Sequence, residues 1–307
     1  MTENEGYTWL DGQLVKNEQA LVPFMTSALH YGLGVFEGIR CYATPRGPAI
    51  FRLREHIQRL FESAKILGFQ SLPFSEEQVA EACKEVVRAN GFDSCYIRPL
   101  IFFDSQVKNL NLDVGWARVG IAAWYWGAYL GEEALEKGAR MNISSFTRLH
   151  PNIMMTKAKI TGNYANSVLA KTESARLGFD EAIMLDPQGY VAECTGENLF
   201  IVRRGVIYTP GTWAVLEGIT RDAIITLARD MGCEVQEAQI SRDHLYIADE
   251  CFVSGTAAEI IPVTEIDHRV IGNGRRGPLT YQLMQAFHAV VRGEDERYQH
   301  WLEPVNA

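Results

Sequence analysis

Near the middle of the chain stands the octapeptide Lys157-Ala158-Lys159-Ile160-Thr161-Gly162-Asn163-Tyr164. Apolar Val168, Leu169 and Ala175 follow at helical spacing, so the pattern predicts a helix that begins near Tyr164. A lysine and a phenol therefore lie close together at an element boundary. A lysine amine becomes a nucleophile toward an aldehyde only where neighbours or burial disfavour its charge, and a buried helix start supplies both conditions. This is the arrangement that a Schiff-base enzyme needs, but most single lysines are simply solvated, and the octapeptide alone does not establish such a function.

Composition limits the class of protein. The chain has 307 residues, of which 47% are hydrophobic and 22% charged, as is typical of a globular protein with room for two domains. Its net charge of −9 argues against nucleic acid or an anionic membrane as a partner, because both bind clustered Lys and Arg. Residues 1–6 have no basic or apolar start, and the most apolar region, 119–130, is too short to cross a bilayer. We therefore expect a cytoplasmic protein.

The six cysteines and seven histidines show no metal-ligand spacing. No Cys-x-x-Cys pair occurs, and cysteines this far apart in a chain of this length are typical of reduced, packed thiols. We expect neither a disulfide framework nor a metal in the chemistry.

Apolar periodicity and turn residues predict the order of the elements. Ser75 and Gln78 form a capping box at the start of the second helix, and Gly91 ends that helix. Glycines and charges over 127–138 interrupt the pattern and predict a domain boundary. The expected elements are a hairpin over 9–15, helices over 54–68 and 75–90, interior strands over 95–103 and 118–125 with an irregular loop over 104–116 between them, strands over 139–145, 180–186, 190–193 and 198–202, a helix over 220–231, a strand, a short helix from 242, two further strands and a last helix from 278.

Several polar groups are placed where a ligand could meet them. Tyr96 and Arg98 share one face of a mostly buried strand, so their side chains need partners or a ligand. The stretches 217–221 and 254–257 present bare backbone N–H groups that could hold a phosphate, although ordinary helix starts and tight turns look the same. Glu193 or Glu197 could face a ring nitrogen and keep it protonated; spacing alone does not choose between them.

A dinucleotide site is not predicted. Gly272-Asn273-Gly274-Arg275-Arg276-Gly277 fits the G-x-G-x-x-G pattern, but Pro278 follows it and the remaining residues cannot complete a βαβ unit.

Five motifs together carry a family resemblance. They are the octapeptide, Tyr31-Gly32-Leu33-Gly34-Val35-Phe36-Glu37-Gly38-Ile39-Arg40, Glu193-Cys194-Thr195-Gly196-Glu197-Asn198-Leu199-Phe200, Leu216-Glu217-Gly218-Ile219-Thr220-Arg221 and Ser254-Gly255-Thr256-Ala257-Ala258-Glu259. In these motifs the chain closely resembles the branched-chain amino acid aminotransferases, which are class IV, fold type IV, pyridoxal-phosphate enzymes. The resemblance runs in order from about Trp9 to the last residues.

The resemblance implies an α+β fold of two domains and a homo-oligomer, either a dimer or a trimer of dimers with each active site built from two subunits. The expected domains are a smaller N-terminal α/β sandwich over 1–127, an interdomain loop over 128–138 and a larger C-terminal pseudo-barrel with surrounding helices over 139–307. The expected cofactor is pyridoxal 5′-phosphate. No metal, nucleic acid or membrane is expected.

The resemblance also implies the site residues. Lys159, not Lys157, would hold pyridoxal phosphate as a Schiff base and move the proton, Tyr164 would bond the phenolic oxygen, and Glu193 would pair with the ring nitrogen. The expected phosphate ligands are Arg59, Leu216 through its backbone surroundings, Ile219, Thr220 and Thr256. The expected substrate pocket comprises Tyr31, Phe36, Gly38, Arg40, Tyr96, Arg98, Trp126, Tyr129, Thr256 and Ala257, with Leu110 arriving from a neighbouring subunit. The α-carboxylate of the substrate is expected near Tyr96 and the amides of Thr256 and Ala257. Arg98 with Tyr31 would accept the distal carboxylate of glutamate.

The implied reaction is ping-pong transamination of L-leucine, L-isoleucine and L-valine with 2-oxoglutarate. The alternatives of the same fold are a D-amino acid or (R)-amine transaminase and an aminodeoxychorismate lyase, and an alternative of another class is a cofactor-binding protein without catalysis. Thr161, Cys194-Thr195 and the loop over 105–113 depart from the usual family pattern. These departures affect the expected substrate range and loop motion, not the cofactor anchors.

Overall fold

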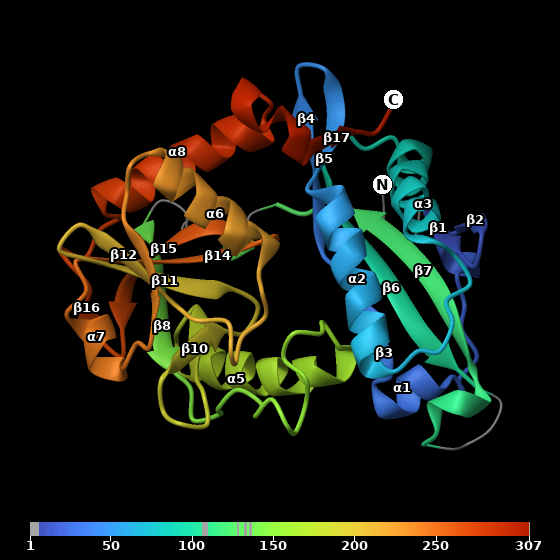
Figure 1. Ribbon diagram of the computed structural model, residues 1–307, viewed down its shortest axis with the longest axis horizontal. Coiled ribbons are helices and arrows are strands. Elements are labelled where there is room, and N and C mark those ends of the chain that lie inside the picture. Colours follow the sequence, from blue (N-terminus) through green and yellow to red (C-terminus); the bar gives the residue numbers. More distant parts are fainter. Residues whose placement is uncertain (1–5, 106–109, 128, 132–133, 135–136, 307) are drawn as a thin grey trace. The chain divides into compact units, whose positions relative to one another are not determined.

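The computed structural model describes residues 6–105, 110–127, 129–131, 134 and 137–306. The chain forms two compact units (Figure 1). The first unit comprises Met1–Trp126, Ala158–Gly162 and Val290–Ala307, and the second comprises Gly127–Lys157 and Asn163–Ala289. Parts of the predicted loop over 104–116 and of the predicted boundary over 127–138 lie outside the described residues. The domain bounds predicted from the sequence stay a prediction.

The first unit is built on one antiparallel sheet with the order β17-β5-β4-β6-β7-β1-β2, and β3 pairs with β6. The predicted N-terminal hairpin is confirmed, and its turn residues Asp11 and Gly12 have φ values of 49° and 96°. The strands are β1 (Tyr7–Leu10), β2 (Gln13–Lys16), β3 (Gly34–Phe36), β4 (Ile39–Thr44), β5 (Gly47–Phe51), β6 (Cys95–Asp104), β7 (Trp116–Trp124) and β17 (Leu302–Pro304).

Two long helices cover this sheet, with α2 beside β3 and α3 beside β1 and β7 (Figure 1). The predicted capping box of Ser75 and Gln78 is confirmed, as is the end of α3 at Gly91. The buried face of α2 includes His56 and Ser63 as well as apolar residues, so this helix presents polar groups inward. The helices of the first unit are α1 (Ser27–Tyr31), α2 (Leu53–Leu67) and α3 (Glu76–Asn90), with 3₁₀ turns η1 (Asn17–Gln19), η2 (Leu112–Val114) and η4 (Glu296–Trp301).

The second unit is built on a mixed sheet with the order β10-β9-β8-β15-β14-β11-β12-β13, and β16 pairs with β15. Its core is aliphatic and includes Met141, Leu199 and Val253, all fully buried. The strands are β8 (Ala139–Ile143), β9 (Glu181–Leu185), β10 (Val191–Cys194), β11 (Asn198–Arg203), β12 (Val206–Pro210), β13 (Val235–Ala238), β14 (Glu250–Gly255), β15 (Glu259–Ile266) and β16 (Arg269–Val270).

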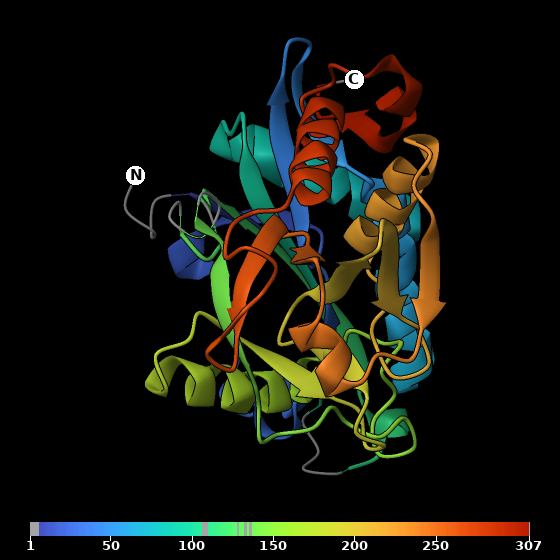
Figure 2. The ribbon, with the colours of Figure 1, turned by 90° about the vertical axis from the view of Figure 1, so that its left-hand side faces the viewer.

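The helices of the second unit are α5 (Tyr164–Arg176), α6 (Ile219–Asp230), α7 (Arg242–Tyr246) and α8 (Pro278–Val291), whose last residues belong to the first unit, with the 3₁₀ turn η3 (Thr161–Asn163) before α5. Helix α6 packs against β14, and α5 packs against β9 (Figure 2). Among the described residues, no helix is long and apolar enough to cross a membrane.

Helix α5 begins where the sequence predicted it, but the apolar residues whose spacing predicted it do not form its buried face. Val168 and Leu169 are 61% and 52% exposed. The buried positions are instead small: Ser167, Ala170 and Ser174. Small residues let the helix approach β9 closely, so the larger apolar side chains point away from the sheet.

Candidate active site

The segment 158–162 lies along β3, although the residues on both sides of it belong to the second unit. Ile160 forms a β-bridge with Val35, and the carbonyl oxygen of Lys159 accepts the N–H of Phe36 at 3.0 Å. The N–H of Lys159 donates to a helix α2 side chain, Ser63 Oγ, at 3.0 Å. Backbone pairing and one hydroxyl therefore fix the main chain on both sides of the lysine, which indicates a preorganised position for its amine.

Thr161 adds a side-chain contact to this pairing. Its hydroxyl donates to the carbonyl oxygen of Gly32 at 2.7 Å. Gly32 has a φ of +67°, and a Cβ at this position would lie 2.9 Å from the Cα of Gly162. The close approach of these two segments thus requires glycine at position 32.

Beneath this segment, three charged or polar groups of the first unit form a buried cluster. Glu37 is 0% exposed. Its carboxylate accepts two N–H groups of Arg59, at 2.7 and 2.8 Å, and lies 2.7 Å from His56 Nδ1. His56 Nε2 is also buried and has no hydrogen-bond partner among the described residues. Glu37 therefore orients the guanidinium that the sequence predicted to hold a phosphate.

The protonation of this cluster follows from its contacts. Burial alone would raise the pKa of Glu37, but the charge of Arg59 and the hydrogen bonds from His56 and Arg59 together hold that pKa well below its ordinary value. Burial is the largest influence on His56 and lowers its pKa; the Glu37 carboxylate raises it, the positive charges of Arg59 and Lys159 lower it, and the net pKa lies below its ordinary value. The cluster is therefore an ionised carboxylate, a neutral imidazole and a cationic guanidinium at neutral pH.

Aromatic rings surround a single arginine on the first sheet. Arg98 Cζ lies 4.7, 5.3 and 5.6 Å from the ring centres of Phe36, Tyr96 and Trp124. The ring of Trp126 packs edge-on against Tyr96 at 4.6 Å. We call Arg98 and these four aromatic residues the Arg98 box. Arg98 Nε is buried and has no partner among the described residues, so the box offers an apolar lining with one spare N–H donor.

Trp124 is a member of the box that the sequence prediction missed. It lies directly opposite Tyr96 in the antiparallel pairing of β6 and β7. Both strands were predicted correctly, and their pairing register would have placed the two rings on one face.

The other predicted pocket residues of the first unit differ in how closely they approach the Arg98 box. Arg40 donates to the carbonyl oxygen of Trp126 at 3.3 Å. Gly38 leaves room for Tyr96, because a Cβ at Gly38 would lie 1.8 Å from the Tyr96 hydroxyl. Tyr31 and Leu110 are 46% and 79% exposed, so neither belongs to the Arg98 box.

In the second unit, Glu193 on β10 is held by three donors. Arg148 forms an ion pair with its carboxylate at 2.6 Å, and both side chains are at most 9% exposed. The side-chain amide of Asn198 and the backbone N–H of Leu216 donate to it at 3.3 and 3.2 Å. These contacts hold the Glu193 carboxylate in place. The bond from Leu216 also connects the loop before α6 to β10.

Arg148 was not predicted as a functional residue. It is 8% exposed and lies between β8 and α5, where its sequence neighbours show no periodicity. No signal in the sequence distinguishes it from a surface arginine.

The predicted anion-binding motifs lie at one end of the second sheet. Asn198, at the start of β11, pairs with Ser254, near the end of β14. Thr256 and Ala257 follow at the turn to β15. Ile219 and Thr220 are the first residues of α6, which packs on β14. The N-terminal amides of this 12-residue helix carry a partial positive charge suited to a phosphate.

Two predicted tyrosines also belong to the second unit. Tyr164 is the first residue of α5. The Tyr129 hydroxyl would lie 3.8 Å from a Cβ at Gly196, so it is near the turn between β10 and β11.

These residues fit the three chemical parts of pyridoxal phosphate. Lys159 offers an amine for its aldehyde, Glu193 a carboxylate for its protonated ring nitrogen, and the start of α6 offers amides and the Thr220 hydroxyl for its phosphate. The close packing at the α6 start supports this fit, because a Cβ at Gly218 would lie 2.0 Å from Asn198 Oδ1.

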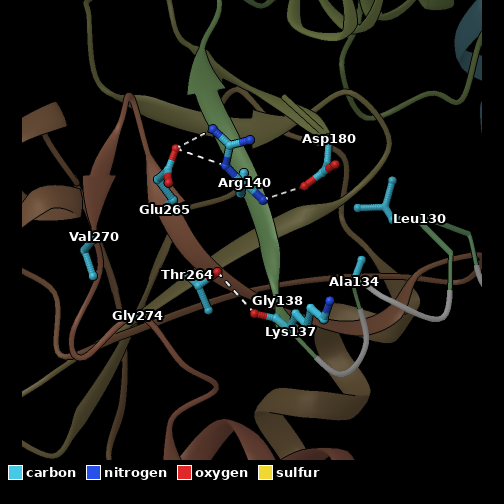
Figure 3. Close-up of a pocket in the computed structure, with 10 residues that line it drawn as sticks. All are labelled: Leu130, Ala134, Lys137, Gly138, Arg140, Asp180, Thr264, Glu265, Val270 and Gly274. Carbon is cyan, nitrogen blue, oxygen red and sulfur yellow. Dashed lines mark hydrogen bonds and ion pairs between the residues drawn. The ribbon is translucent and has the colours of Figure 1, made fainter. Parts of the chain in front are cut away.

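No group of three or more His, Cys, Asp or Glu residues within the described parts of the chain could hold a metal ion. A cavity of about 400 Å³ lies elsewhere in the second unit (Figure 3). In this cavity the Arg140 side chain forms an ion pair with Glu265 at 2.9 Å. The backbone N–H of Arg140 donates to the Asp180 carboxylate at 2.7 Å. Its lining contains none of the predicted site residues, and its Glu265 and Asp180 side chains already contact Arg140, so it is not the candidate site.

Comparisons with known proteins give a consistent result along the whole chain. A family model described as amino-transferase class IV matches residues 34–266. The branched-chain-amino-acid aminotransferase of Pseudomonas aeruginosa is 51% identical over 301 residues, which cover 98% of each chain. A crystal structure of the Escherichia coli branched-chain amino acid aminotransferase has a TM-score of 0.96 at 49% identity, covering 98% of this chain and 100% of that one. A crystal structure of the T.th. branched-chain amino acid aminotransferase with pyridoxamine 5′-phosphate has a TM-score of 0.95 at 51% identity, covering 98% of this chain and 99% of that one.

Proposed function

Because the chain belongs to the amino-transferase class IV family, we propose that it transfers the amino group of L-leucine, L-isoleucine and L-valine to 2-oxoglutarate. The products are branched-chain 2-oxo acids and L-glutamate. The predicted family, the α+β fold class and the pyridoxal phosphate cofactor are confirmed. The protein is an enzyme whose substrates are small amino acids and 2-oxo acids.

Each proposed catalytic group has a defined task. Bound pyridoxal phosphate supplies an aldehyde that accepts the amino group and a ring that withdraws electrons. Lys159 Nζ would hold the cofactor through its aldehyde and would take the proton from the substrate Cα. Glu193 would hold the proton on the ring nitrogen, and Arg148 forms an ion pair with the Glu193 carboxylate. Tyr164 donates to the phenolic oxygen.

The phosphate of the cofactor is held by charges and backbone amides. The proposed ligands are Arg59, the Thr220 hydroxyl and the amides around Leu216, Ile219 and Thr256. The ion pair of Arg59 with Glu37 supports this assignment, because a guanidinium fixed by two N–H bonds has a defined remaining face.

One observation carries the proposed substrate class: the Arg98 box combines four aromatic rings with a buried arginine Nε that has no partner among the described residues. The rings suit an uncharged branched side chain. Arg98 suits the distal carboxylate of glutamate. A ping-pong transaminase must bind a branched-chain amino acid and glutamate in turn. A box with an aromatic lining and an arginine can bind both side chains.

A half-reaction experiment tests the function. Mixing the holoenzyme with L-leucine should bleach its absorbance, and adding 2-oxoglutarate should restore it with formation of glutamate. Lys159→Ala should abolish turnover. Activity with D-alanine and none with L-leucine would instead identify a D-amino acid transaminase, and absorbance unchanged by every amino donor would contradict catalysis.

We further propose a cytoplasmic homo-oligomer, either a dimer or a trimer of dimers, with Leu110 contributed to the site of a neighbouring subunit. The exposed apolar face of α5 and the 79% exposure of Leu110 support this assembly, since large apolar side chains at this exposure are suited to a protein interface.

A further inference from the structure

Glu197 is a buried carboxyl group outside the proposed chemistry. It follows β10 in the second unit and is 3% exposed. One oxygen, Oε2, accepts the N–H of Gly196 at 3.0 Å. The other, Oε1, is buried and has no hydrogen-bond partner among the described residues. An ionised carboxylate with an unpaired oxygen in this position would be unstable, so the geometry favours the neutral acid.

The charges around Glu197 lead to the same conclusion. The neighbouring titratable groups are Glu181 on β9, Glu193 and Cys194 on β10, Cys251 on β14, Lys171 on α5 and Tyr129 before β8. The two nearby cations are already engaged: Lys171 pairs with Glu181 at 2.6 Å and Arg148 with Glu193 at 2.6 Å. Glu197 is the third carboxyl of the group and has no cation of its own within the described structure. Burial first, and the charge of Glu181 second, raise the pKa of Glu197 to about 8.

The side chain of Glu197 lies against the turn between β14 and β15. A Cβ at Gly255 would lie 3.1 Å from the carbonyl oxygen of Gly196 and 3.4 Å from Glu197 Cγ. Gly255 directly precedes Thr256 and Ala257, whose amides are expected from the family resemblance to lie near the substrate α-carboxylate. A negative charge behind this turn would oppose the binding of an anion in front of it.

We propose that Glu197 is a positioning residue that must stay protonated for the 255–257 turn to bind the substrate carboxylate, and that its ionisation weakens the binding of carboxylate substrates. This inference rests on the proposed function and on the expectation, from the family resemblance, that the substrate α-carboxylate binds the amides of Thr256 and Ala257. As the pH rises through the pKa of Glu197, the site gains one negative charge close to the bound carboxylate.

The test measures binding of 4-methylpentanoate, a branched carboxylate without an amine to titrate. Its affinity for the holoenzyme is measured by calorimetry between about pH 7 and pH 9, a range that brackets the ionisation. We expect the affinity of the wild-type enzyme to fall roughly fivefold to tenfold across this range. In Glu197→Gln, which keeps a neutral side chain of the same shape, the affinity should be independent of pH over the same range. Glu234→Gln, at an exposed carboxylate of the same unit, should behave like the wild type.

Steady-state kinetics provide a second measurement. With 4-methyl-2-oxopentanoate as substrate, the wild-type KM should rise above about pH 8 by the same factor while kcat changes less, and Glu197→Gln should remove the rise. A purely structural role for Glu197 would not give a pH-dependent KM that the neutral amide abolishes.

Two results would overturn the inference: a wild-type affinity that stays constant to about pH 9, or a fall in affinity that persists in Glu197→Gln. The first needs no variant and so does not depend on how Glu197→Gln folds. Failure of the proposed function would appear differently, as no glutamate formed from any branched-chain donor, whereas the binding measurement requires no turnover.

Discussion

At the scale of single residues, the ion pair of Arg148 and Glu193 combines stability with function. Both side chains are at most 9% exposed, and the pair is closed at 2.6 Å. A buried ion pair contributes little net stability compared with an apolar pair, but removing one partner leaves the other as an uncompensated buried charge. Glu193 is also the group proposed to hold the ring proton. The same contact is therefore expected to affect both folding and turnover.

We predict that Arg148→Ala lowers the free energy of unfolding by about 3 to 5 kcal/mol and slows the half-reaction with L-leucine. Denaturant unfolding and stopped-flow absorbance measure the two effects. Arg203→Ala is a matched control, because Arg203 pairs with Asp249 at 2.6 Å but with side chains 38% and 47% exposed. That exposed pair should contribute less than about 1 kcal/mol. Equal effects of the two substitutions would contradict the role assigned to Arg148.

His56 gives the protein a predicted pH dependence of stability. In the unfolded chain its pKa is near 6.5, and in the folded protein it is lower because the ring is buried. Below about pH 6.5 the unfolded chain therefore binds a proton that the folded protein does not. The contribution of His56 to the free energy of unfolding is fully present above this pH. It falls as the pH drops, by at most about 1.4 kcal/mol per pH unit.

Denaturant unfolding at a series of pH values measures this slope. His56→Asn keeps a donor for Glu37 and should make the slope between about pH 6.5 and pH 5 shallower. His268→Asn, at a side chain 71% exposed, should leave the slope unchanged. A slope that is the same in wild type and His56→Asn would assign the acid sensitivity to other groups.

At the scale of elements, the segment 158–162 shows how a short stretch outside the long helices and strands can be fixed in place. Its backbone pairs with β3 at Ile160, and the Thr161 hydroxyl donates to Gly32. Because Lys159 lies between these contacts and the bond to Ser63, a shift of the segment would move the proposed catalytic amine.

We predict that Thr161→Val lowers kcat about threefold to tenfold, because it removes one neutral hydrogen bond of about 0.5 to 1.5 kcal/mol. Thr161→Ser retains the hydroxyl and should keep most of the activity. Steady-state rates with L-leucine and 2-oxoglutarate measure both variants. If the valine variant matched the wild type, the hydroxyl would not be needed to position Lys159.

The elements also show what the sequence could and could not predict. Local signals predicted both ends of α3: the capping box at its start and Gly91 at its end. They could do so because the residues within and next to a helix of this length determine where it begins and ends. Strand β17 was missed, since it pairs with β5 about 250 positions earlier in the sequence and carries no local pattern of its own. The inward polar groups of α2, His56 and Ser63, are invisible to apolar periodicity.

The candidate site was predictable to a similar extent. Family motifs nominated Lys159 and Glu193 because each stands in a distinctive stretch, and Arg98 was noted because it shares a face of a buried strand with Tyr96. The residues that orient the functional groups were not predicted: Ser63 contacts Lys159, Arg148 contacts Glu193 and Glu37 contacts Arg59, each from a distant part of the chain. Such contacts depend on the packing of the elements and leave no spacing in the sequence.

At the scale of the whole molecule, the exposed face of α5 is unusual for a chain that acts alone. Val168 and Leu169 are 61% and 52% exposed, although they gave the helix its apolar pattern. Ala165 and Thr172 are exposed on the same face at helical spacing. A helix with small residues toward its own sheet and larger apolar residues toward solvent is suited to packing against a second copy of the chain.

We therefore predict that the double variant Val168→Asp/Leu169→Asp weakens the homo-oligomer, because an interface would have to bury two unpaired carboxylates. Sedimentation velocity should show a smaller species at concentrations where the wild type stays assembled. The control is Val270→Asp, at a valine on β16 that is also 61% exposed, which should sediment like the wild type.

If the double variant kept the wild-type mass, the second copy would have to bind another surface. If the Val270→Asp control also dissociated, introducing aspartate at any exposed apolar position would explain the loss of assembly, and the α5 face would have no special role. Because the proposed site takes Leu110 from a neighbouring subunit, dissociation should also lower turnover, and adding wild-type protein in excess should not restore the activity of the variant subunits.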